Sequence, residues 1–113
     1  SWTRSAPWPV AAASAPTAAA NTIAGKWRDD NGNFWTVPQT TSSPFDVRFD
    51  ASDGRSMNTF SANWASGLQG MQFVIVFSGD YYDECTFTFN AANPSQLAGR
   101  CSASGEFMLQ RVP

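Results

Sequence analysis

The acidic segment 80–84, with the sequence Asp-Tyr-Tyr-Asp-Glu, holds the side chains that could most directly do chemistry. Two of its carboxylates could act as acid and base on a glycoside, and several together could bind calcium. The chain contains no histidine, so the commonest general base and the commonest metal ligand are missing. We therefore interpret the segment as a solvated turn, and we predict no catalytic residue, no metal site, no cofactor and no enzymatic activity.

Cys85 and Cys101 are the only cysteines, and neither lies in the basic, exposed setting that a nucleophilic cysteine needs. If a hairpin turns near Asn93, the two cysteines are equally far from the turn and share a face with Phe87 and Leu97. Cross-strand neighbours of this kind can bring their Cβ atoms within reach of a disulfide. We favour a disulfide over a pair of buried thiols, and a disulfide indicates an oxidising compartment.

The composition indicates an exported protein and argues against nucleic acid or a membrane as partner. Charged residues make up 14% of the chain, against roughly 25% in ordinary soluble domains. The net charge of −2 offers no basic surface to phosphates or anionic lipids. No apolar run approaches the roughly 20 residues that span a bilayer. We expect an extracellular or periplasmic protein that does not bind nucleic acid and has no transmembrane segment.

The first 22 residues form a leader that differs from the rest of the chain, because they are rich in alanine and proline and contain few large side chains. One interpretation is a semi-rigid tether that joins the folded domain to a neighbouring domain or, in a lipid-anchored precursor, to the membrane. The other is an arm that docks on its own domain or on a partner, with Trp2 and Trp8 as anchors. We expect a leader over 1–22 and a β-domain over 23–113.

From residue 23 onward, apolar and polar residues alternate, and turn residues recur about every ten positions. Eight strands are expected, over 23–29, 34–40, 45–50, 58–65, 71–78, 84–90, 97–103 and 106–112. Short connections between consecutive strands favour a barrel over a sandwich. The predicted fold is all-β, an eight-stranded antiparallel up-and-down barrel behind an Ala/Pro-rich N-terminal leader, with an interior filled by aromatic side chains.

The sequence Gly25-Lys26-Trp27 at the start of the first strand resembles the G-x-W opening of the calycin barrels, which include lipocalins and avidins. In these barrels an arginine near the end of the last strand covers the tryptophan, and Arg111 stands at the matching position. The resemblance implies that Gly25, Trp27 and Arg111 are structural. A guanidinium over an indole contributes roughly 0.5 to 2 kcal/mol. The polar residues with which avidins contact biotin cannot be placed on this chain.

In size and layout the chain is similar to the small bacterial metalloprotease inhibitors and the related outer-membrane lipoproteins, which carry an Ala/Pro-rich leader before the G-x-W strand. In those inhibitors the leader reaches into the peptidase cleft, and residues 1–10 would be the corresponding segment here. One departure is clear, because the disulfide of that family involves early strands whereas Cys85 and Cys101 lie late in this chain.

We expect the protein to bind a protein partner and to inhibit a secreted hydrolase through its leader. Tryptophan, tyrosine and arginine most often dominate interfaces. The expected partner-binding residues are Ser1, Trp2, Arg4, Trp8, Trp35, Tyr81 and Tyr82. Trp35 could instead pack under the leader.

Two other functions stay open at this point. The barrel could bind one small hydrophobic ligand, although a filled interior leaves little room for it. The leader could also be donated as a strand to the sheet of a neighbouring subunit, which requires the sheet to have an open edge.

Overall fold

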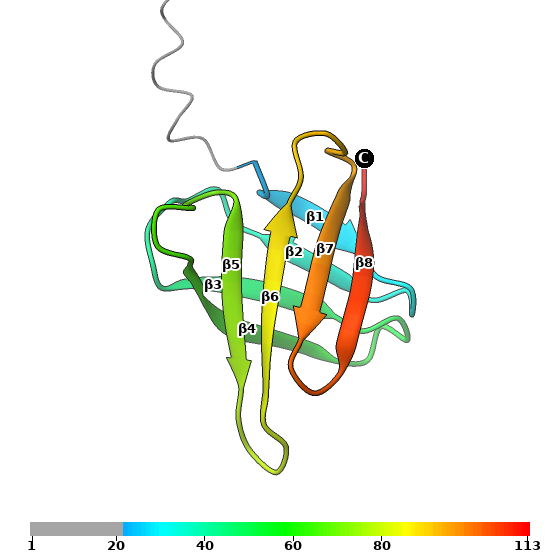
Figure 1. Ribbon diagram of the computed structural model, residues 1–113. Helices are drawn as coiled ribbons and strands as arrows, with labels where there is room; N and C mark the ends of the chain where they lie inside the picture. The colour runs from blue at the N-terminus through cyan, green and yellow to red at the C-terminus, as the bar shows by residue number, and fades with distance from the viewer. Residues whose placement is uncertain (1–21) are drawn as a thin grey trace, which may run out of the picture.

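The computed structural model describes residues 22–113, which form a closed barrel of eight antiparallel strands (Figure 1). The strands are β1 (Gly25–Arg28), β2 (Phe34–Val37), β3 (Phe45–Asp50), β4 (Met57–Trp64), β5 (Gln72–Phe77), β6 (Asp83–Phe89), β7 (Gln96–Cys101) and β8 (Gly105–Arg111). Each strand pairs with the next along the chain, and β8 pairs with β1. The predicted up-and-down barrel is therefore confirmed. The described part of the chain contains no helix of the length and apolarity needed to cross a membrane.

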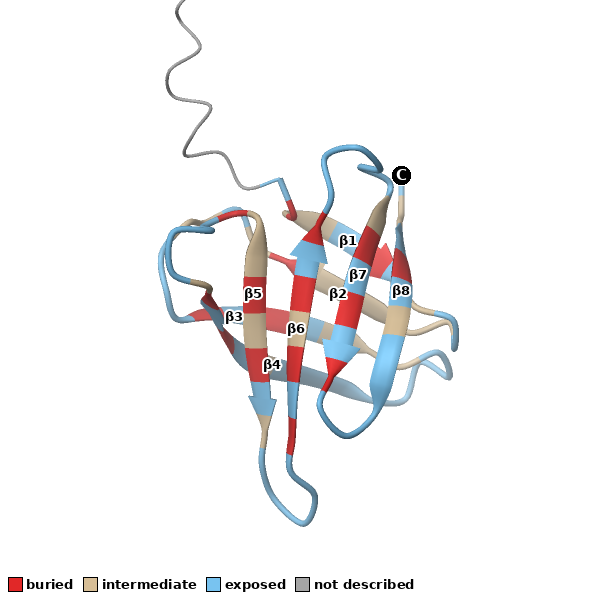
Figure 2. Cartoon of the chain, in the orientation of Figure 1, coloured by how far each residue is buried: buried red, intermediate tan, exposed pale blue. Residues whose placement is uncertain are grey.

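The alternation of the sequence determines which face of each strand is buried. Along β6, Cys85 and Phe87 point inward and are buried, whereas Glu84 and Thr88 are exposed (Figure 2). The inward rings pack closely in the middle of the barrel, with Phe73 and Phe87 stacked at a centroid distance of 4.7 Å. Burial of this apolar face is the main driving force for folding.

The connections divide the barrel into two ends, because every strand reverses direction. The turns 29–33, 51–56, 78–82 and 102–104 lie at one end, which we call the open end. The loops 38–44, 65–71 and 90–95 lie at the other, which we call the closed end. The described chain enters β1 and leaves β8 at the closed end (Figure 1).

Some strand limits differ from the expected ones for local reasons. β1 begins at Gly25 because Ile23 leaves the ladder and is fully buried as part of the core. β2 ends at Val37 because the next residue, Pro38, has no N–H to donate to a neighbouring strand.

The seam between β1 and β8 is the shortest ladder of the barrel. The last residues of the two strands pair, at Trp27↔Arg111 and Arg28↔Gln110. On its other side β8 pairs with β7 along its whole length, as far as Cys101↔Gly105. The start of β8 therefore has no β1 partner at the open end.

Candidate binding site at the open end

Trp27 and Arg111 seal the closed end. The indole N–H of Trp27 donates to the carbonyl oxygen of Ile23 at 2.8 Å, and the Arg111 guanidinium lies 4.2 Å from the centre of the Trp27 ring. Arg111 also donates to the carbonyl oxygens of Ala24, at 3.0 Å, and Thr22, at 2.7 Å. A Cβ at Gly25 would stand 3.1 Å from the guanidinium, at a φ of 125° that other residues rarely adopt. This end is filled, and the polar groups of Trp27 and Arg111 are paired.

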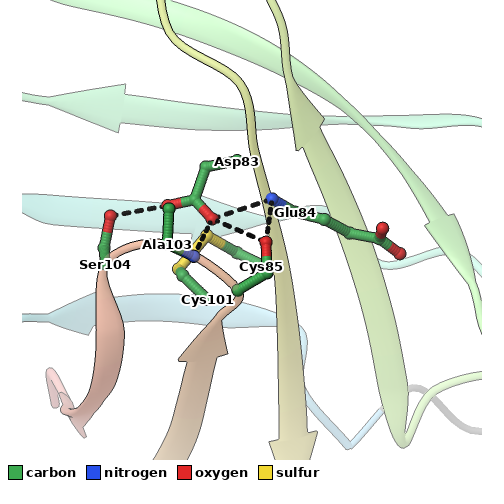
Figure 3. The surroundings of a disulfide bond; sticks show 7 residues. Asp83, Glu84, Cys85, Cys101, Ala103 and Ser104 are labelled. Carbon is green, nitrogen blue, oxygen red and sulfur yellow. Dashed lines mark hydrogen bonds between the residues drawn. A yellow bond between two sulfur atoms is a disulfide. The ribbon is translucent and has the colours of Figure 1, made fainter.

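The open end is fastened by a disulfide and by one buried carboxylate (Figure 3). Cys85 and Cys101 lie opposite each other on β6 and β7 and are joined, as predicted from their equal distances to the turn. Asp83, next to them, is 3% exposed and accepts hydrogen bonds from the Ala103 N–H at 2.8 Å and from the hydroxyl of Ser104. These contacts tie the 102–104 turn to the start of β6.

The hydrogen bonds around Asp83 hold the pKa of its carboxyl below the usual range, and the Ser104 hydroxyl makes the largest contribution. Segment 80–84 is therefore only partly the solvated turn that was expected. Tyr81 and Tyr82 are exposed, but Asp83 is a structural anchor. Its carboxylate lies within 4.8 Å of the sulfurs of Cys85 and Cys101. Those sulfurs are bonded to each other, so they do not supply thiolate ligands to a metal.

Half-buried aromatic rings line the open end, in contrast to the filled interior below them. They are Trp35, Phe49, Phe60, Phe77 and Phe107. Trp35 contacts Phe49 at a centroid distance of 4.8 Å and Phe87 at 5.5 Å. The prediction of a filled interior therefore describes the closed half of the barrel better than the open half.

Trp35, one of the expected partner-binding residues, lies within the strand expected over 34–40 and is not exposed. It lies in β2 opposite Trp27 and Phe49, with its ring packed against the core. Its indole N–H donates to Asp29 Oδ2 at 3.0 Å. The alternation that buries its neighbour Val37 also turns Trp35 toward the interior.

A hollow of about 380 Å³ opens beside these rings. Its lining includes Asp29, Asp30, Trp35, Phe87, Ser104 and Phe107, and the disulfide forms part of its wall. A second, larger hollow lies along the outer wall of β6 to β8 and shares Asp30 and Phe107 with the first. The two hollows therefore meet where β1 and β8 diverge.

Gly99 is a residue of this site that sequence reasoning missed. It faces inward on β7 opposite Phe107, and a Cβ there would overlap the Phe107 ring. Its lack of a side chain lets Phe107 reach across β7 to Phe87, at a centroid distance of 5.7 Å. A glycine inside an alternating strand marks a close approach, and that signal could have identified it.

The expected partner-binding residues do not form one described surface. Tyr81 and Tyr82 stand at the open end, 61% and 60% exposed. Ser1, Trp2, Arg4 and Trp8, together with all of the leader before Thr22, lie outside the described residues. The Thr22 hydroxyl donates to the carbonyl oxygen of Gly70 at 2.7 Å, which places the start of the described chain at the closed end.

The fold and the contact of Arg111 with Trp27 define a small closed antiparallel β-barrel with one filled end and one aromatic end, an architecture consistent with a calycin-like barrel. No protein-family model, curated protein or solved structure matches the chain.

Proposed function

We propose that this barrel is an exported binding protein, related in architecture to the calycins, that holds a protein partner at its open end. The observation that carries the proposal is the aromatic hollow beside Trp35 and Phe107, with two exposed tyrosines at the same end. Tyrosine and tryptophan are enriched among interface hot spots, so their presence at one end favours that end as the binding surface. The disulfide is compatible with an oxidising, exported location.

The distribution of exposed apolar side chains supports the same surface. Met57, Val76, Tyr81 and Tyr82 lie in or beside the open-end turns, with exposed fractions from 51% to 61%. At the closed end, Leu68 is 42% exposed. Four of the six large apolar side chains that are exposed in the described part of the chain therefore lie toward the open end, which favours this end as an interaction surface.

Retention of partners on the immobilised protein tests this proposal. The double variant Tyr81→Ser with Tyr82→Ser should lose proteins that wild type retains from an extracellular or periplasmic fraction. The matched control Leu68→Ser changes an exposed apolar residue at the closed end and should retain them. Equal retention by both variants would overturn the open end as the binding surface.

Inhibition of a secreted hydrolase through the leader is a separate proposal from binding at the open end, because the described chain begins at the closed end. Removing residues 1–10 should abolish inhibition and leave the barrel folded, because the core is built from residues 23–109. An unchanged inhibition constant would remove the leader from the mechanism.

A small hydrophobic ligand is the second candidate, and the hollow of about 380 Å³ favours it. Ligand pockets commonly measure roughly 300 to 1,000 Å³. Saturable binding of an uncharged hydrophobic fluorescent probe at the open end, without any retained protein, would favour this function over protein binding.

Strand donation by the leader is the third candidate. The closed barrel counts against it, although the start of β8 has no β1 partner. Light scattering over a concentration series separates it from the others. Self-association of the full chain, together with a monomeric chain lacking residues 1–22, would indicate assembly.

A further inference from the structure

The hollow at the open end combines aromatic rings with negative charge. Trp35, Phe87 and Phe107 supply the rings, and Asp29 and Asp30 supply the carboxylates. Among the residues that the structure describes, no lysine or arginine lines the hollow. A site of this composition disfavours anions and leaves both the rings and the carboxylates without a cation.

Asp29 is held in place by neutral groups. Its Oδ1 accepts the N–H groups of Asn31 and Asn33, both at 2.9 Å, and its Oδ2 accepts the Trp35 indole N–H at 3.0 Å. These bonds fix the carboxylate beside the indole without neutralising its charge.

Asp30 is exposed at the point where the two hollows meet. The ion pairs within the described range join other residues, namely Arg48 with Asp50, Arg55 with Asp53, and Arg100 with Glu106. The rim of the hollow therefore carries a carboxylate that no described basic side chain pairs with.

At the closed end, a cation already packs against a tryptophan ring. There the protein places its own guanidinium, that of Arg111, 4.2 Å from the Trp27 ring. Trp35 lies opposite Trp27 in the ladder and has carboxylates nearby but no arginine. An indole face with adjacent negative charge attracts cations, arginine above all.

We infer that the hollow receives a cationic side chain, arginine or lysine, presented by the protein partner. The inference rests on the proposed function and deepens it, because it names the chemistry that the partner must bring. Asp30 attracts the cation at the rim, and the rings of Trp35 and Phe107 contact it inside. Charge complementarity selects this occupant over an acidic or purely apolar one.

The test uses two near-isosteric probes, Nα-acetyl-arginine amide and Nα-acetyl-citrulline amide, which differ in charge. Each is titrated to millimolar concentrations into the ¹⁵N-labelled full chain while the Trp35 indole N–H signal is followed. The arginine probe should shift this signal and the Asn31 and Phe107 amides saturably, and added salt should weaken its binding. The citrulline probe should bind at least about threefold more weakly, as expected for loss of one exposed charge interaction.

Two variants localise the effect. Asp30→Asn should weaken binding of the arginine probe about threefold and leave the citrulline probe unchanged. The matched control Asp53→Asn removes an exposed carboxylate at another open-end turn, and it should leave both probes unchanged.

The possible outcomes separate the inference from the proposed function. Equal binding of the two probes, shifts confined to the closed end, or no shift at all would overturn the inference. If partner retention still depends on Tyr81 and Tyr82, the proposed function survives that failure. If the arginine probe binds preferentially but the immobilised protein retains no partner, the occupant of the hollow is not a side chain of a protein partner.

Discussion

Trp27 and Trp35 lie opposite each other on β1 and β2, yet they serve the two ends of the barrel differently. Trp27 is fully buried, its N–H is bonded to Ile23, and Arg111 covers its ring. Trp35 is half-buried, its N–H bonds to Asp29 in an open-end turn, and a hollow lies beside it. The comparison shows that a tryptophan is buried where Arg111 covers its ring, and that a tryptophan without such a cover stays partly exposed beside a hollow.

Replacing each of the two tryptophans with alanine should give the largest difference in stability between the two ends. Trp27→Ala should lower the free energy of unfolding by about 3 to 5 kcal/mol, the range for a buried aromatic residue. Trp35→Ala should cost about half as much, because part of its ring is already exposed. Denaturant titration of both variants measures this difference. A loss below about 1 kcal/mol for Trp27→Ala would show that the plug is not structural.

Removing the disulfide should loosen the open end. Cys85 and Cys101 are 16 residues apart, and a loop of that size corresponds to about 3 kcal/mol of stabilisation. In Cys85→Ser with Cys101→Ser, amide exchange should increase most in turns 78–82 and 102–104. A uniform increase over both ends would argue against a locally fastened open end.

Replacing tryptophan with phenylalanine at two positions of the closed half measures what the polar contacts of Trp27 contribute to stability. Trp27→Phe loses the hydrogen bond to Ile23 and part of the Arg111 contact, so it should cost about 2 kcal/mol. Trp64→Phe should cost about 1 kcal/mol, because the buried Trp64 N–H has no partner among the described residues. Equal losses of stability in the two variants, measured by thermal unfolding, would mean that the polar contacts of Trp27 contribute little to stability.

Asp83 should give the open end a pH dependence. Its pKa is lower in the folded state, so its carboxylate adds stability that is fully present above the unfolded pKa and is lost as pH falls through the folded pKa. Below about pH 4, wild type should therefore lose stability more steeply than Asp83→Asn. The control Asp46→Asn, at an exposed position on β3, should keep the wild-type slope. Identical slopes in all three proteins would exclude this role for Asp83.

The strands and their register could be predicted because the signals are local. Alternation of apolar and polar residues sets the buried face, and turn residues near Asn93 place Cys85 opposite Cys101. The open-end site could not be derived in the same way. The burial of Asp83 depends on Ser104, and the ring position of Phe107 depends on the absent side chain of Gly99. Such side-chain contacts form only once neighbouring strands have paired, and the alternation of apolar and polar residues does not predict them.

Photo-crosslinking from the two ends tests the central claim most directly. A benzophenone amino acid replaces Tyr82 at the open end or, as the matched position, Leu68 at the closed end. Irradiation in an extracellular or periplasmic fraction should give a discrete crosslinked partner from position 82 and none from position 68. A partner captured equally from both positions, or from position 68 alone, would contradict the open end as the binding surface.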